Sequence, residues 1–165
     1  MGNKSKKYKV LFVCLGNICR SPAAQAVMQG VVDRRGLTHR FFIDSAGTYG
    51  GHTGQLPDKR MRVHARPRGY ELTHLARRIT GSDLEEFDLV VAMDNGNVRD
   101  LQGMAVTVEE SRKIVMMGDY ITQFPHYDYV PDPYYEGAEG FELVLDLLED
   151  SCENLLDQIE ENIEF

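Results

Sequence analysis

The residues with the clearest chemical potential lie near the start of the chain, where five residues separate Cys14 from Arg20 and Ser21 follows. An apolar, strand-like run ends at Cys14, and a helical pattern opens at Ser21-Pro22. A loop between a strand end and a helix start can direct its N–H groups at an anion, aided by the helix dipole. An arginine there can hold two phosphate oxygens. A cysteine thiolate in the same positive field can attack phosphorus.

The residues between the two ends suit such a loop, which comprises Leu15, Gly16, Asn17, Ile18 and Cys19. Gly16 allows close backbone approach, and Asn17 tolerates a left-handed conformation. The Ser21 hydroxyl can donate to the sulfur as it leaves. The spacing alone is a weak signal, because a cysteine that ends a buried strand is often only a small apolar residue. No Walker GKS or GKT motif is present, and Cys14 and Cys19 lack zinc-site spacing.

Attack on a phosphate ester also needs an acid that protonates the leaving oxygen. Asp132 is the best candidate, because prolines on both sides stiffen its segment. Tyr134 and Tyr135 follow it and offer apolar faces with polar tips, which suit the walls of a pocket for an aromatic substrate. Asp128 is the competing acid and has no flanking prolines. A plain Pro-Asp-Pro turn with exposed tyrosines fits the composition equally well.

Alternating short strands and helices must position these residues. Apolar runs predict strands at 8–14, 41–43, 87–93 and 113–117. Helical patterns follow Ser21-Pro22 and cover 56–65, 95–101 and 141–159, while 82–85 resembles a capping box and 118–135 a long loop. This order predicts an α/β domain with a doubly wound, four-stranded parallel sheet and helices on both faces. Ligands of such folds bind beyond the carboxyl ends of strands, where Cys14 and Asp94 lie.

Length, apolar runs and the number of cysteines exclude several classes of protein. The 165 residues predict one domain over 1–165, with residues 1–7 as a flexible basic tail. No apolar run reaches 18 residues and no signal-type segment opens the chain, so we expect a cytoplasmic protein without a membrane partner. Three cysteines exclude a fully paired disulfide framework.

The net charge of −8 argues against a nucleic-acid partner. However, residues 136–165 contain 11 acidic and no basic residues, which leaves 15 acidic and 18 basic residues, a net +3, in 1–135. The acidity therefore belongs to the last segment and not to the predicted anion loop.

Together these segments resemble the low-molecular-weight protein tyrosine phosphatases. The resemblance runs from VLFVCLGNICRSP through IDSAGT and VVAMD to DPYY and the last helix. It implies a four-stranded parallel sheet, a cysteinyl-phosphate intermediate, and no metal or cofactor. It also implies phosphotyrosine proteins, a tyrosine kinase among them, as substrates, and phosphate or vanadate as ligands of the site.

The resemblance also implies a role for each matching residue. Cys14 matches the nucleophile and Arg20 the phosphate-binding arginine. Ser21 matches the hydroxyl that assists departure of the sulfur. Asp132 matches the general acid, which later activates water.

Further residues match supporting positions. Asn17 and His74 match side chains that hold the loop in shape, although His74 alone fits an ordinary core or helix-face histidine. Asp94 matches a carboxylate near the loop, and a helix N-cap is the alternative. Cys19 matches the neighbour that traps oxidised Cys14 as a reversible disulfide, and a packing residue at the helix start is the alternative.

Two segments depart from the family pattern. Many relatives carry an aromatic wall residue, often Trp, after the SAGT segment, where this chain has Gly50-Gly51 and no Trp. Either Tyr49 replaces that wall, or the pocket is more open on this side. The aromatic loop 120–130 has no assigned role.

Particular residues distinguish the other functions that occur on this fold. Phosphoarginine phosphatases resemble this chain but carry Thr at the place of Ile18, so Ile18 and the tyrosine pair favour phosphotyrosine. Thiol-coupled arsenate reductases need two further cysteines, and residues 80–120 contain none. A non-catalytic phosphate-binding module stays an alternative, although the complete set of nucleophile, arginine, hydroxyl and acid argues against it.

Overall fold

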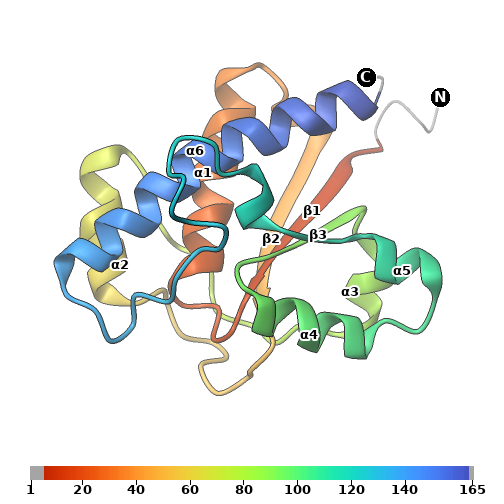
Figure 1. Ribbon diagram of the computed structural model, residues 1–165, viewed down its shortest axis with the longest axis horizontal. Helices are drawn as coiled ribbons and strands as arrows, with labels where there is room; N and C mark the ends of the chain where they lie inside the picture. Colours follow the sequence, from red (N-terminus) through yellow and green to blue (C-terminus); the bar gives the residue numbers. More distant parts are fainter. Residues whose placement is uncertain (1–5, 164–165) are drawn as a thin grey trace.

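The computed structural model describes residues 6–163 and consists of one sheet with helices on both faces (Figure 1). The predicted basic tail at 1–7 lies mostly outside the described residues; residues 6 and 7 precede the first strand without regular structure. No helix within 6–163 combines the length and apolar character that crossing a membrane requires.

The sheet has four parallel strands, as predicted. They are β1 (Tyr8–Cys14), β2 (Phe41–Gly47), β3 (Leu89–Ala92) and β4 (Ile114–Met116), in the order β2-β1-β3-β4. The register pairs Cys14 with Gly47 and Val13 with Ala92, so the carboxyl ends of three strands meet at one edge. Strand β2 extends to Gly47, four residues beyond its apolar run, because polar residues there still pair with β1.

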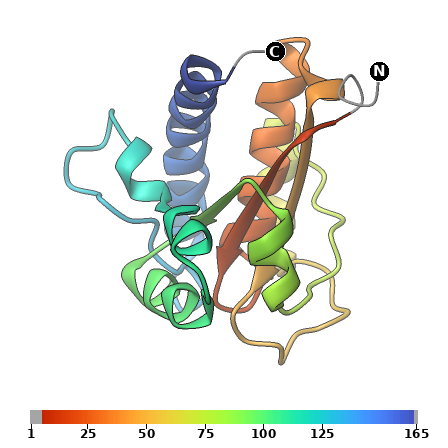
Figure 2. The ribbon, with the colours of Figure 1, turned by 90° about the vertical axis from the view of Figure 1, so that its right-hand side faces the viewer.

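Within residues 6–163, six α-helices surround the sheet: α1 (Arg20–Arg34), α2 (Lys59–Ala65), α3 (Gly81–Glu86), α4 (Asn95–Met104), α5 (Val108–Arg112) and α6 (Ala138–Asn162). Single 3₁₀ turns lie at Thr38–Arg40, Arg66–Arg68 and Met117–Tyr120. Figure 2 shows α1 and α6 side by side on one face of the sheet, with α3 and α4 on the other.

Alternate residues of β1 face the two helical layers. Val10 and Phe12 belong to the apolar cluster under α1 and α6, whereas Leu11 and Val13 belong to the cluster under α3 and α4. All four are fully buried. A strand that is buried on both faces reads as a continuous apolar run, which is why the sequence indicates β1 so clearly.

The starts of α2 and α3 differ from the sequence prediction, because capping hydrogen bonds determine where these helices begin. Helix α2 begins at Lys59 rather than Leu56, because the Asp58 carboxylate caps it by accepting the Arg60 N–H at 2.8 Å. The predicted capping box at 82–85 is wrong: the box joins Thr80 and Asp83, two residues earlier. Ser82 and Glu85 instead lie inside α3.

Helix α5 was not predicted, because its five residues carry no apolar periodicity. It is held at its start by Thr107, whose hydroxyl accepts the Glu110 N–H at 3.0 Å. Helix α6 begins at Ala138, three residues before the predicted start.

The aromatic loop 120–130 is fastened to α6. The Asp150 carboxylate accepts the backbone N–H groups of Thr122 and Gln123 at 2.8 and 3.0 Å, and Asn154 donates to the Tyr120 carbonyl at 2.8 Å. A side chain at Gly118 would collide with the backbone of Asp128, so the loop folds tightly over this glycine. The loop thereby has a fixed path from β4 toward the carboxyl edge of the sheet.

The acids of α6 form ion pairs with neighbouring helices and turns. Arg35, which follows α1, contacts three of them, at 2.7–3.0 Å: Glu153, Asp157 and Glu160. Arg68 contacts three others, at 2.6–2.9 Å: Glu142, Asp146 and Glu149. Much of the acidity of the chain thus lies along α6, next to the arginines that it pairs with.

Candidate active site

A pocket of about 240 Å³ opens where loop 15–19 joins β1 to α1. Its lining contains the predicted nucleophile, arginine, acid and pocket tyrosines: Cys14, Leu15, Gly16, Ile18, Cys19, Arg20, Tyr49, His52, Asp132, Tyr134 and Tyr135. His52 is the member that the sequence reasoning missed, because a lone histidine in a Gly- and Thr-rich loop carries no motif.

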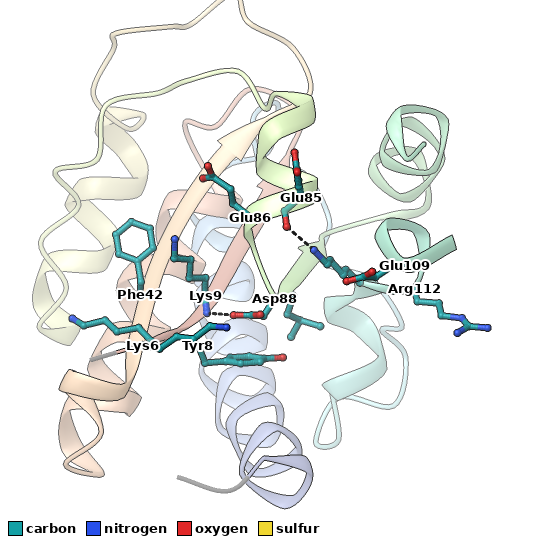
Figure 3. Close-up of a pocket in the computed structure, with 12 residues that line it drawn as sticks. Lys6, Tyr8, Lys9, Phe42, Glu85, Glu86, Asp88, Glu109 and Arg112 are labelled. Atoms are coloured by element: carbon teal, nitrogen blue, oxygen red, sulfur yellow. Dashed lines mark hydrogen bonds between the residues drawn. The ribbon is translucent and has the colours of Figure 1, made fainter. Parts of the chain in front are cut away.

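A larger hollow, of about 1040 Å³, lies at the opposite edge of the sheet (Figure 3). Its lining mixes cations such as Lys6 and Arg112 with carboxylates such as Glu109, and it includes no cysteine. The Asp88 carboxylate is already occupied there by the Lys9 backbone N–H, at 2.8 Å. Size therefore does not identify the site, whereas the chemistry of the smaller pocket does.

Asn17 shapes loop 15–19. It is fully buried and has φ = 59°, the left-handed conformation that asparagine tolerates. Its Oδ1 accepts the Arg77 backbone N–H at 2.9 Å and lies 3.0 Å from Nε2 of His74. Its Nδ2 donates to the hydroxyls of Ser21 and Ser45, at 2.8 and 3.0 Å. The side chain thus joins the loop to α1, β2 and the segment 74–77.

The hydrogen bond between His74 and Asn17 defines the tautomer of the histidine ring. Because the Arg77 N–H can only donate, the atom facing it is the Asn17 oxygen, and His74 must then donate to that oxygen from Nε2. Burial, together with the charge of Arg77, lowers the pKa of His74 and favours the neutral ring, while the Asp44 charge opposes this. Arg77 itself is held between Asp44 and Asp83, at 3.1 and 2.9 Å.

Ser21 presents two donors to the nucleophile candidate. Its Oγ lies 3.0 Å from the Cys14 Sγ, and its backbone N–H donates to the same sulfur at 3.4 Å. Asn17 donates to this Oγ, so the hydroxyl proton of Ser21 points either to the sulfur or to the Ala46 carbonyl, which lies 3.4 Å away. Such an arrangement stabilises negative charge on Cys14.

Arg20 is buried, with 2% of its surface exposed. Its Nη1 donates to Asp94 at 2.7 Å and to the Val130 carbonyl at 3.0 Å, while its Nη2 lies 3.7 Å from the Asp132 carboxylate. Burial opposes the charged guanidinium, but the negative charges of Cys14, Asp94 and Asp132 keep the pKa of Arg20 above its usual value. The guanidinium is therefore charged and fixed in orientation.

Asp94 joins the start of α4 to the Arg20 side chain. It is the N-cap of α4, where its Oδ1 accepts the Asn97 N–H at 2.9 Å, and its Oδ2 binds Arg20. Burial raises the pKa of Asp94, but the bonds from Arg20 and Asn97 outweigh it and lower the pKa overall.

Asp132 lies on the rim of the pocket, with 42% of its side chain exposed. Its Oδ1 accepts the Tyr134 N–H at 3.0 Å, which fixes the carboxylate. The rings of Tyr134 and Tyr135 meet edge to face, with centroids 5.0 Å apart. Asp128 is not among the residues that line the pocket.

Tyr49 and His52 also line the pocket. Their rings meet edge to face, with centroids 6.1 Å apart, and a side chain at Gly51 would collide with the Tyr49 ring. Tyr49 thus lines the pocket next to the Gly50-Gly51 segment, and the lack of a side chain at Gly51 makes room for its ring. The His52 ring covers Gly16, where an added Cβ would lie 3.0 Å from its Cδ2.

Cys19 lies at the end of the loop and is buried with a free thiol. Burial, reinforced by the charge of Asp58, raises the pKa of the Cys19 thiol, so that it stays protonated. Both Cys14 and Cys19 line the pocket.

Comparison with known proteins decides the family. The model of the low molecular weight phosphotyrosine protein phosphatases matches residues 9–164. The chain belongs to this family. It is thus a phosphatase of the hydrolase class, and the predicted resemblance and the four-stranded parallel fold are both confirmed.

Particular relatives cover nearly the whole phosphatase. A low molecular weight protein-tyrosine-phosphatase of Streptomyces coelicolor is 42% identical over 158 residues, which cover 95% of this chain and 96% of that protein. The crystal structure of an Entamoeba histolytica protein tyrosine phosphatase with Hepes in its active site superposes with a TM-score of 0.90, at 47% identity and with 93% and 97% coverage. A Drosophila arginine phosphatase superposes at 0.85, with 35% identity and 92% and 98% coverage.

The contacts of Asn17 generate a first prediction. Asn17→Ala should lower the free energy of unfolding by about 3 kcal/mol, because it leaves buried polar partners unsatisfied and puts alanine at positive φ. Asn17→Gly should recover about 1 kcal/mol, since glycine accepts that φ. Both variants should bind phosphate more weakly than the wild type.

Urea denaturation and phosphate titration by calorimetry measure these effects. The control is Asn162→Ala, which removes only a side-chain hydrogen bond to the Gln158 carbonyl near the end of α6. Wild-type phosphate affinity in Asn17→Ala would show that the side chain does not shape the loop.

Proposed function

We propose that this phosphatase hydrolyses phosphotyrosine monoesters in proteins through a cysteinyl-phosphate intermediate. The observation that carries the proposal is that the Cys14 sulfur lies 3.0 Å from the Ser21 hydroxyl oxygen, in a pocket whose lining includes Arg20 and Asp132. Family membership makes phosphoproteins the substrates, and tyrosine kinases are among those expected.

Binding would place the phosphate in loop 15–19. The backbone N–H groups of the loop and the start of α1 surround the anion, and the Arg20 guanidinium adds charge-assisted bonds. Because Asp94 and Val130 hold this guanidinium at 2.7 and 3.0 Å, its orientation is set before the substrate arrives. Such preorganised donors stabilise the charge that develops on the equatorial oxygens.

In the first step the Cys14 thiolate attacks phosphorus, and the bond from phosphorus to the tyrosyl oxygen breaks. Asp132, in its protonated form, gives its proton to that oxygen, and tyrosine leaves. In the second step Asp132 takes a proton from water, and the resulting oxygen attacks phosphorus. The P–S bond breaks, phosphate is released, and Ser21 donates to the regenerated thiolate.

The walls of the pocket favour an aromatic ester. Tyr49 and Tyr134 contribute aromatic rings to the lining, and Ile18 adds an apolar side chain. The Drosophila relative is titled an arginine phosphatase, so phosphoarginine is the alternative substrate. A phosphoarginine side chain lacks the ring that these walls suit, and we therefore favour phosphotyrosine.

Substitution of the nucleophile tests the covalent mechanism. Cys14→Ser should reduce hydrolysis of p-nitrophenyl phosphate and of a phosphotyrosine peptide by at least about 10⁴-fold, because the serine hydroxyl is a far weaker nucleophile. Vanadate should still bind, since the loop and Arg20 stay in place. Cys152→Ala, which removes a thiol from the core, is the control and should retain turnover. Substantial turnover in Cys14→Ser would contradict the mechanism.

Substitution of the acid tests the role of Asp132. Asp132→Ala should lower kcat by about 10²–10⁴-fold for phosphotyrosine, whose leaving oxygen is basic. The loss should be smaller for p-nitrophenyl phosphate, which needs less protonation. Asp128→Ala should change kcat less than about twofold, since Asp128 does not line the pocket. The reverse result would give the acid role to Asp128.

We also propose that Cys19 protects the nucleophile. Peroxide would oxidise Cys14 to a sulfenic acid, and the Cys19 thiol would then displace its hydroxyl as water to form a disulfide. Mass spectrometry after mild peroxide should detect the Cys14–Cys19 linkage, and thiol reagents should restore activity. Cys19→Ser should instead accumulate sulfinic or sulfonic acid at Cys14. Finding only these irreversible products in the wild type would refute this role.

A further inference from the structure

A third hollow, which we call the side groove, adjoins the pocket that contains Cys14. It has a volume of about 470 Å³ and is lined by Leu15, Thr48, Tyr49, Gly50, Gly51, Thr53, Arg78 and Asp100. Leu15 and Tyr49 line both hollows, and they are 49% and 56% exposed. A peptide with its phosphotyrosine in the pocket can therefore cross this rim and place a flanking residue in the side groove.

Arg78 has a fixed backbone at the wall of the side groove. Segment 77–79 runs parallel to the end of β2, where the Gly47 N–H donates to the Arg77 carbonyl at 2.9 Å and the Ile79 N–H donates to the Gly47 carbonyl at 2.8 Å. The Arg78 side chain lies along Gly50, where an added Cβ would lie 3.2 Å from its Cδ. The absence of a side chain at Gly50 thus gives the arginine its path.

Two consecutive arginines have different uses here. Successive side chains of an extended segment point to opposite faces. Arg77 binds Asp44 and Asp83 and supports the loop through its backbone bond to Asn17. Arg78 is exposed, and within residues 6–163 it forms no ion pair with a carboxylate. Its guanidinium is available to a ligand.

Asp100 of α4 is the carboxylate among the residues that line the groove. It lies beyond ion-pair distance from Arg78, since no contact within 4.0 Å joins them in the described chain. The groove therefore presents a planar cation with several N–H donors and a separate negative charge. A carboxylate of the substrate can form two parallel bonds with such a guanidinium, and Asp100 would weaken this attraction.

We propose that the side groove binds a residue flanking the phosphotyrosine and that Arg78 makes the enzyme prefer an acidic one. This inference rests on the proposed function, because it needs the phosphotyrosine in the pocket. The substrate class is thus narrowed to phosphotyrosine segments with a nearby Glu or Asp. The contact lies at a partly open surface, so the preference should be about fivefold in kcat/KM.

The test compares phosphotyrosine peptides that are identical except for Glu, Gln or Lys at each of the two positions on either side of the phosphotyrosine. The wild type should favour Glu over Gln by about fivefold at one of these positions, and salt should reduce the preference. Arg78→Met, which keeps an apolar stem, should abolish it, and Arg78→Glu should reverse it. Asp100→Asn should increase it by about twofold.

Two controls separate this inference from the proposed function. p-Nitrophenyl phosphate has no flanking residues, so its hydrolysis should be equal in the wild type and the Arg78 variants. Arg112→Met removes an exposed arginine at the opposite edge of the sheet (Figure 3) and should leave the peptide preference unchanged.

A wild type that hydrolyses p-nitrophenyl phosphate and every peptide but shows no preference for Glu would overturn the role of Arg78 alone. The same holds if Arg78→Met keeps the full preference, or if Lys is favoured. Failure of the wild type to hydrolyse any phosphotyrosine substrate would overturn the proposed function, and this inference with it.

Discussion

The site depends on the hydrogen bonds of the Asn17 side chain, whose backbone is in the left-handed conformation. A loop that curves around an anion leaves its own polar groups without regular partners, and in the interior this costs free energy. Asn17 meets that constraint with four bonds, to Ser21, Ser45, His74 and the Arg77 backbone. Each partner belongs to a different part of the chain from the loop itself, so the curvature of the loop is set by the whole carboxyl edge of the sheet.

Arg20 provides the second connection between distant segments. Its bonds to Asp94 and to the Val130 carbonyl join the loop to the start of α4 and to the segment that carries Asp132. That segment is also held by the Val130 N–H, which donates to the Met93 carbonyl at 2.8 Å, and by the Asp150 contacts of the aromatic loop. The position of Asp132 relative to the Cys14 sulfur therefore depends on β3, α4 and α6 together.

The net negative charge of the chain lies away from the pocket. The total charge of −8 is concentrated on α6, where Arg35 and Arg68 pair with six of its acids. The pocket, by contrast, contains a buried arginine and the start of α1. The net charge of the chain therefore does not describe the electrostatic potential at the pocket, because screening limits the reach of distant charges to about 10 Å.

The sequence by itself determined the four strands, the main helices and the members of the site that carry a motif. Runs such as 8–14 are apolar on both faces, and the Cys14 to Ser21 spacing is local, so neighbouring residues contain this information. Only the tertiary structure shows that Tyr49 and His52 line the pocket, how Arg20 is oriented and that Arg77 and Arg78 have different contacts. Short helices such as α5, and the box at Thr80, also escaped prediction, because single capping bonds decide them. Local pattern determines which element forms, whereas parallel crossovers and loop paths determine which distant side chains meet.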